Sequence, residues 1–215
     1  MVQIHQSFIP QGRRNRPGRT SRMEFITIHN TGNPSVGAGA SNHARYLQGN
    51  AAAGLPVSWH YTIDGREIFQ HLPDNEDAFH AGDGGGNGNR HSIGLEIAEN
   101  SDGDLRRATD NAVWLTALLC VRHNIPTANI RQHHDWSSRA GCPARLRQNR
   151  PYSWAQFIAN VTAEIERQRQ PAPTPETSET LFRVQIGAFR VRANAEQALQ
   201  RAEAAGFTDA FILEG

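Results

Sequence analysis

The stretch FITIHN, residues 25–30, decides how the chain folds, because an apolar run leads directly into a histidine and an asparagine. A short apolar run of this kind is typical of a buried strand. His29 closes the strand and is followed by Asn30, Thr31 and Gly32, so its imidazole emerges where a strand meets a loop. Functional side chains gather at such places, although a lone histidine there is more often structural.

Working outward, further strands alternate with helices. WHYTI and REIFQHL flank Asp64-Gly65 and predict a hairpin, and SIGLEIA, residues 92–98, predicts another strand. Apolar residues recur at helical spacing between about 107 and 123, with Cys120 among them as an expected core residue. A second helix is expected to start at Ser153, whose SWAQ matches a capping box. The pattern indicates an α/β domain.

A spacer divides the chain. Residues 168–180, QRQPAPTPETSET, hold three prolines and no apolar periodicity. Downstream, residues 182–186 alternate like a half-buried strand, a helix follows that Asn194 could cap and Gly206 could end, and AFIL, residues 210–213, predicts a last strand. We therefore expect a domain at 1–167, a linker at 168–180 and a small βαβ unit at 181–215. A unit of about 35 residues is expected to need a partner or a docking surface.

Composition excludes several functions. The chain has 215 residues and a formal net charge of +1, so nothing global points to nucleic acid. All 22 basic residues are arginines, which rules out any reaction that needs a lysine amine. The first residues lack the apolar run of a signal peptide, and no stretch approaches the ~18 apolar residues of a membrane span. We expect no membrane partner and no export signal.

The segment HHDWSSRAGCP, residues 133–143, is dense in groups that bind metals. It offers two imidazoles, a thiol, and an aspartate that could hold a ligand's second ring nitrogen. HExxH and CxxC motifs are absent, so a zinc site would have to come from strand ends and loops. Hydrolytic zinc needs three protein ligands, which His29, His133 and Cys142 could supply. By spacing alone, a polar loop explains the segment equally well.

Four segments resemble, in order and wording, the type 2 N-acetylmuramoyl-L-alanine amidases of phage and bacillus wall-lytic enzymes: ITIHNTG, SWHYTIDGREIFQHLPDN, FHAGDGGGNGNRHSIGLEIAEN and HHDWSSRAGCP. The resemblance covers roughly residues 1–165. It implies a zinc amidase that cleaves the bond between N-acetylmuramic acid and L-alanine in peptidoglycan. It also implies a central mixed sheet flanked by helices, as in the related peptidoglycan recognition proteins. The alternative function is a noncatalytic module that binds peptidoglycan; such relatives tend to lose the cysteine that Cys142 supplies here.

The resemblance also assigns metal ligands by position. His29, His133 and Cys142 match the three zinc ligands of the family. The family's His-x-Asp pattern selects His133 of the histidine pair, because Asp135 lies two residues on, and leaves His134 as the alternative.

Further residues receive roles in catalysis and substrate binding. Glu96 falls on the family's catalytic acid, whereas Glu99 is expected to be solvated. The family usually carries a lysine near the third ligand; this chain has none, and Arg139 is the nearest cation that could stabilise an oxyanion. Three residues are expected to contact substrate: His80, Asn30 and Thr31. His60 is expected to lie in the core or behind the ligands.

The tail resembles part of another family. RVQIGAF, the Asn-Ala helix start and the later Gly-Phe are similar to the first half of a sporulation-related repeat (SPOR) domain, whose family binds glycan strands of peptidoglycan. Pairing two such halves in a homodimer would complete one sheet. Since the substrate lies outside the cytoplasm and a signal peptide is missing, we expect an endolysin that waits in the host cytoplasm and acts on the cell wall after release.

Overall fold

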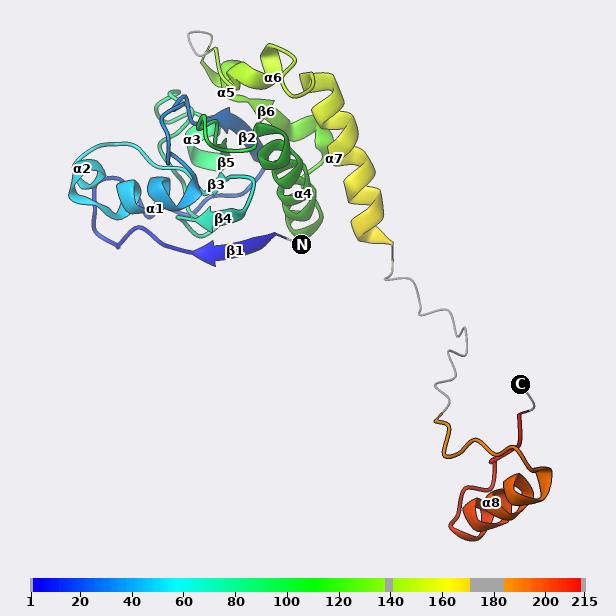
Figure 1. The fold of residues 1–215 in the computed structure, drawn as a ribbon. Coiled ribbons are helices and arrows are strands. Elements are labelled where there is room, and N and C mark those ends of the chain that lie inside the picture. The colour runs from blue at the N-terminus through cyan, green and yellow to red at the C-terminus, as the bar shows by residue number, and fades with distance from the viewer. Residues whose placement is uncertain (1, 138–140, 171–183, 214–215) are drawn as a thin grey trace. The chain divides into compact units, whose positions relative to one another are not determined.

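The computed structural model describes residues 2–137, 141–170 and 184–213, and the chain divides into two compact units, residues 1–171 and 172–215. The first unit is built on one six-stranded sheet (Figure 1) with the strand order β1-β4-β3-β5-β2-β6. The strands β3 and β4 form the antiparallel hairpin that Asp64-Gly65 predicts, and all other neighbours pair in parallel. The predicted mixed sheet is therefore confirmed. The strands are β1 (Gln3–Gln6), β2 (Phe25–Asn30), β3 (Tyr61–Ile63), β4 (Glu67–Gln70), β5 (Ser92–Ile97) and β6 (Ile130–Gln132).

Side chains cap the N-termini of the two long helices, and the cap at Ser153 was predicted from the sequence. The Asp104 side chain accepts a hydrogen bond from the Arg107 amide at the start of α4, and Ser153 accepts one from the Gln156 amide at the start of α7. Asn124 ends α4 in the left-handed conformation, at φ 54°. The helices of this unit are α1 (Ala40–Gln48), α2 (Asn50–Ala53), α3 (Asn87–His91), α4 (Leu105–His123), α5 (His133–Trp136), α6 (Ala144–Arg147) and α7 (Trp154–Arg169), with a 3-10 turn, η1, at Thr127–Asn129.

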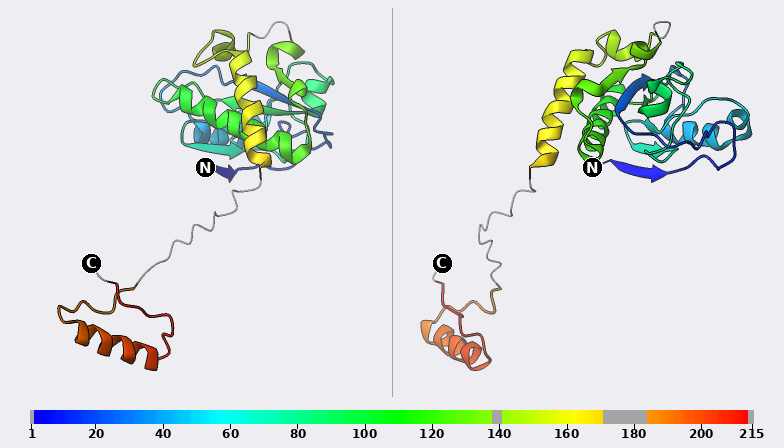
Figure 2. Two further views of the ribbon diagram at one scale, coloured as in Figure 1. Left: turned by 90° about the vertical axis from the view of Figure 1, so that its right-hand side faces the viewer. Right: turned by 180° about the vertical axis from the view of Figure 1, so that it is seen from behind.

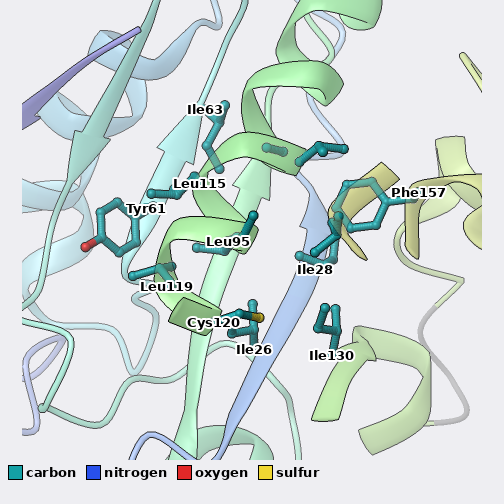
Figure 3. Close-up of a cluster of buried hydrophobic side chains, with 14 of the residues drawn as sticks. Ile26, Ile28, Tyr61, Ile63, Leu95, Leu115, Leu119, Cys120, Ile130 and Phe157 are labelled. Atoms are coloured by element: carbon teal, nitrogen blue, oxygen red, sulfur yellow. The ribbon is translucent and has the colours of Figure 1, made fainter. Parts of the chain in front are cut away.

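One face of the sheet forms the main core. Helices α4 and α7 lie side by side along it, as Figures 1 and 2 show, while α1 contacts β3 and β4 from the other side. Figure 3 shows side chains of β2 and β5, such as Ile28 and Leu95, among those of the helices. Cys120 lies in this cluster, where only 3% of its surface is exposed, so the prediction of a core cysteine is confirmed.

The opposite face of the same strands carries polar residues. Because side chains alternate along a strand, Thr27 and His29 of β2 project away from Ile26 and Ile28. The parallel register places His29 beside Glu96 and Thr27 beside Gly94 of β5. Both His29 and Thr27 are nonetheless buried, at 1% and 0% exposure. The strand pattern that builds the core therefore also places a histidine and a carboxylate together on the other face.

The second unit differs from the expected βαβ arrangement. Its helix α8 (Arg192–Ala204) follows Val191, so the helix begins two residues before Asn194, which does not cap it. Residues 184–186 and 211–213, the described parts of the two expected strands, form no strand. A strand needs a neighbour to satisfy its backbone N–H and C=O groups, and an isolated pair is marginal in water. Without that pairing, Val184, Ile186 and Phe211 are 85%, 74% and 62% exposed.

The junction of the two units lies mostly outside the described residues. Helix α7 extends to Arg169, so the first residues of the expected linker at 168–180 are helical. Residues 171–183, which contain most of that linker, are not described. No helix in the described ranges is long and apolar enough to cross a bilayer.

Candidate metal centre

Three side chains from separate segments meet at the C-terminal edge of the sheet. His29 is near the end of β2, His133 follows the neighbouring strand β6, and Cys142 lies in the loop before α6. One ligand atom from each of the three lies within 4.8 Å of the others. Since parallel strands end at the same edge, the topology itself brings the two histidines together. The structure thus groups the three residues that the sequence analysis selected.

Of the two neighbouring histidines, His133 and not His134 belongs to the cluster. The Gln132 amide donates to Asp135 Oδ2 at 2.8 Å, so Asp135 caps the short helix α5 and does not hold the second nitrogen of a ligand. His134 lies outside the three-residue cluster, and its amide donates to the Cys142 carbonyl at 3.0 Å. This bond ties the cysteine loop to the start of α5.

Asn30 fastens the same loop to β2. Its backbone amide donates to Cys142 Sγ at 3.3 Å, and its side-chain Oδ1 accepts a hydrogen bond from the Arg145 amide at 3.0 Å. The Asn30 side-chain nitrogen also lies 3.4 Å from the Ile97 carbonyl. These bonds give Asn30 a structural role in positioning the thiol, and contact with substrate stays a prediction for this residue.

Glu96 lies next to the cluster with one oxygen available. Its Oε1 is 3.8 Å from His29 Nδ1, and its buried Oε2 has no hydrogen-bond partner within the described part of the chain. Burial, together with the nearby charge of Glu99, raises the pKa of the Glu96 carboxyl well above its ordinary value. A carboxyl with a raised pKa can both accept and return a proton near neutral pH.

Glu99 corrects one expectation. Its side chain is only 8% exposed and accepts a hydrogen bond from Arg145 Nε at 2.9 Å, so Glu99 is buried in an ion pair and not solvated. Arg145 also belongs to the loop that carries Cys142. Sequence analysis missed this pair because residues 99 and 145 are far apart in the chain. The only local signal was the position of Arg145, three residues after the thiol.

The remaining predicted residues fall into different environments. The Thr31 hydroxyl is buried and has no partner among the described residues. His80 is bonded to His29, with 3.0 Å between His80 Nδ1 and His29 Nε2. His60 lies outside the cluster and is buried as expected: its Nδ1 accepts from the Gly94 amide, and its Nε2 donates to the Glu76 carbonyl, both at 2.9 Å. Arg139 lies in the segment 138–140, outside the described residues.

The donor set suits a cation such as zinc. Burial lowers the pKa of His29 well below its ordinary value and also lowers the pKa of His133, so both imidazoles are neutral and keep a lone pair. Burial, followed by the charge of Glu96, raises the pKa of the Cys142 thiol to about 12. A divalent cation would stabilise the thiolate and reverse that shift. Two imidazoles and a thiolate are established zinc ligands, and the partnerless Glu96 oxygen lies beside them.

A groove of about 570 Å³ opens beside the cluster. Its lining includes His80 and His133, together with Arg19, Phe79 and Asn89. The glycine-rich loop that follows His80 contributes Gly82, Gly84 and Gly85 to the same lining. Of the three candidate ligands, His133 therefore borders the groove directly.

Two family models match the sequence. Residues 19–145 match the family described as N-acetylmuramoyl-L-alanine amidase, and residues 159–214 match the SPOR domain. The first match spans every strand of the sheet except β1, and it includes all three candidate ligands. The second begins inside α7, which packs on α4 in the first unit, so its boundary differs from that of the second unit.

Individual relatives agree with the first match. N-acetylmuramoyl-L-alanine amidase XlyA of Bacillus subtilis (strain 168) is 50% identical over 161 residues, which are 75% of this chain and 52% of the relative. CwlH of the same organism is 40% identical over 175 residues, which are 81% of this chain and 67% of the relative. The chain thus spans about half the length of XlyA and two thirds of CwlH.

Solved structures confirm the fold of the first unit. The catalytic domain of XlyA superposes with a TM-score of 0.69 at 49% identity, covering 74% of this chain and 99% of that domain. The structure of PlyL superposes with a TM-score of 0.65 at 32% identity, covering 75% and 96%. The matched share of this chain corresponds in extent to the first unit.

Proposed function

The chain belongs to the N-acetylmuramoyl-L-alanine amidase family, and we propose that it hydrolyses the amide bond between N-acetylmuramic acid and L-alanine in peptidoglycan. The observation that carries this proposal is the grouping of His29, His133 and Cys142 within 4.8 Å, with Glu96 Oε1 3.8 Å from His29. Two neutral nitrogens, one thiol and a carboxyl with a raised pKa are the groups that a metal-assisted amide hydrolysis needs.

We assign zinc as the cofactor, held by His29, His133 and Cys142. When bound there, zinc supplies the Lewis acidity for amide hydrolysis. The cleft lets the lactyl carbonyl of the substrate approach the ligands past His80 and His133. Asn30 and Arg145 keep the thiol in position from the protein side.

Glu96 moves the protons in this proposal. Its Oε2 accepts a proton from the attacking water while the new C–O bond forms. It then gives that proton to the alanine nitrogen as the C–N bond breaks, which leaves a lactyl carboxylic acid and a free alanine amine. At neutral pH the acid's proton passes to the amine. The raised pKa of Glu96 suits both halves of the cycle, because the proton is neither lost too readily nor held too tightly.

Arg139 is our proposal for stabilising the oxyanion. Its support is its position three residues before Cys142 in the sequence of a chain without lysine. The guanidinium offers a fork of donors but does not donate a proton outright, since its pKa is above ~12. An Arg139→Ala change should slow hydrolysis more than Arg139→Lys; equal rates for both variants and the parent would remove Arg139 from the mechanism.

For the second unit we propose binding to glycan strands of peptidoglycan, with two copies pairing as a homodimer. The SPOR match supports glycan binding, and the exposed Val184, Ile186 and Phe211 supply an apolar surface that a second copy could cover. Light scattering on the full chain over a concentration series tests the dimer. A monomer at every concentration would contradict it, and an Ile186→Ser/Phe211→Ser variant should dissociate a dimer if one forms.

The test of the amidase proposal compares the two cysteines. Purified peptidoglycan is incubated with the parent, with Cys142→Ala and with Cys120→Ala, and new alanine amino groups are counted. The parent should release amines, lose this activity to a chelator and regain it with zinc. Cys142→Ala should be inactive, whereas Cys120→Ala, altered only in the core, should keep activity at temperatures where it stays folded. Peptidoglycan binding without amine release by the zinc-loaded parent would favour a noncatalytic recognition module instead.

A further inference from the structure

We propose that His80 is a positioning residue that fixes the tautomer of His29, so that His29 presents Nδ1 to the metal. The inference rests on the metal site of the proposed function and goes beyond it, because His80 is not one of the three ligands. The proposal rests on two contacts that the ring nitrogens of His80 make, one with a backbone carbonyl and one with His29. His80 Nε2 lies 3.3 Å from the Ser92 carbonyl oxygen, and His80 Nδ1 lies 3.0 Å from His29 Nε2.

The directions of these bonds follow from their acceptors. A carbonyl oxygen only accepts, so His80 Nε2 carries the proton. A neutral imidazole has one protonated nitrogen, so His80 Nδ1 offers a lone pair. That lone pair accepts the proton of His29 Nε2. The lone pair of His29 is then on Nδ1, the atom 3.8 Å from Glu96 Oε1.

The position of the His80 ring is fixed from several sides. Gly94 of β5 makes room for it, because a Cβ at residue 94 would lie 2.8–2.9 Å from three atoms of the imidazole. The buried Asn89 Oδ1 accepts hydrogen bonds from the amides of His80 and Ala81, at 2.9 and 2.8 Å. The His80 side chain is half-buried and forms part of the groove lining. Because Gly94 has no side chain, the His80 imidazole has room to lie against β5, where it contacts His29.

The same short segment also approaches the second candidate ligand. A Cβ at Gly82 would lie 3.8 Å from His133 Nε2. Residues 80–82 therefore lie beside both candidate imidazole ligands. Partners that orient ligating histidines and fix their tautomers are worth about 10- to 100-fold in metal affinity.

Two substitutions separate positioning from packing. His80→Asn keeps a short side chain whose carbonyl can accept a proton near the place of Nδ1, whereas His80→Leu fills the space and accepts nothing. Zinc affinity is measured by competition with a chromophoric chelator, alongside the urea midpoint of each apo protein. We expect His80→Leu to bind zinc about 10- to 100-fold more weakly, and His80→Asn to recover most of that loss. Parent-like affinity in His80→Leu, or equal losses in both variants, would overturn the proposal.

A measurement on the parent protein avoids any folding problem in the variants. Two-bond nitrogen–proton correlation spectra of the ¹⁵N-labelled apo chain report the tautomer of each histidine. We expect the Nε2–H form for both His29 and His80, and an Nδ1–H form of His29 would overturn the proposal. The proposed function fails separately: a parent that binds zinc but releases no alanine amines contradicts only the amidase activity, whereas a parent that binds no zinc contradicts both.

Discussion

The side chains of β2 and β5 alternate between two faces of the sheet, and the two faces have different roles. On one face Ile26, Ile28 and Leu95 pack against α4 and α7, and every one of them is fully buried. On the other face Thr27 and His29 are also buried although they are polar, and Glu96, whose side chain is 13% exposed, has one buried oxygen without a partner among the described residues. Burying apolar groups stabilises the fold, whereas burying unpaired polar groups costs stability and shifts pKa values. The comparison indicates that one face supplies stability and the other chemistry.

The largest expected effect comes from Glu96 on the polar face. Glu96→Gln should lower the rate of amine release by about 10²- to 10⁴-fold, because the amide cannot take and return a proton. Zinc affinity should stay close to that of the parent, since Glu96 is not in the ligand cluster. The apo variant should be at least as stable as the parent at neutral pH, because burial disfavours the charged carboxylate. Rates equal to those of the parent with zinc bound would exclude Glu96 as the proton carrier.

The opposite result is expected on the apolar face. Phe157 of α7 is 0% exposed and lies in the cluster with Ile28, so Phe157→Ala should lower the free energy of unfolding by about 3–5 kcal/mol. Below its melting temperature the variant should keep the zinc affinity of the parent, because none of the three candidate ligands belongs to the apolar cluster that contains Phe157. Urea denaturation and chelator competition measure the two quantities. A large loss of zinc affinity without a loss of stability would mean that the two faces are not separate in function.

The edge between the faces provides a smaller effect. Glu99 and Arg145 form their ion pair where β5 has ended, beside the loop of Cys142. Arg145→Gln leaves the largely buried Glu99 carboxylate without its cation and should cost about 2 kcal/mol in stability. Glu99→Gln should cost less, since Arg145 is more exposed, at 28% against 8%. The order of the two losses, measured by urea denaturation, tests the assignment; a reversed order would contradict a buried Glu99.

Much of this organisation could be predicted from the sequence because it follows from local rules. Strand alternation in FITIHN predicted a buried strand ending in His29, and Ser153 predicted the start of α7. The ligand set came from the resemblance, which the cluster geometry then supported by bringing His29, His133 and Cys142 together. These features depend on the period of one element or on a motif, and both can be read from one stretch of chain.

What could not be predicted depends on contacts between distant segments. The bond between His80 and His29 joins residues 51 positions apart, and the pair of Glu99 and Arg145 joins residues 46 positions apart. Asp135 was expected to hold the second ring nitrogen of a ligand, but it caps a helix, because its carboxylate accepts a hydrogen bond from the nearby Gln132 amide. The prediction of two strands in the second unit was wrong for a related reason. Alternation of apolar and polar residues shows that a segment can pair, but not that a partner strand is present.

The smallest expected effect on stability comes from a buried histidine on the polar face of the sheet, away from the candidate metal ligands. His71 is fully buried, and its Nε2 lies 2.8 Å from the hydroxyl of Thr62, which also accepts a hydrogen bond from Trp59 Nε1 at 2.7 Å. Burial, followed by the neighbouring His43 and His60, lowers the pKa of His71 to about 3. In the unfolded chain a histidine titrates near ~6.5. The neutral ring therefore favours the folded state above that pH.

As the pH falls from about 6.5 toward 3, the unfolded chain takes up a proton at His71 that the folded protein does not, so stability must fall. This single site accounts for a slope of up to about 1.4 kcal/mol per pH unit. His71→Gln keeps a polar side chain but does not titrate, so its free energy of unfolding should decline less steeply between pH 7 and pH 5 than that of the parent. Urea titrations at several pH values measure both slopes. Identical slopes would show that His71 is accessible to protons in the folded state, and that the polar face is shielded from water only around the metal ligands.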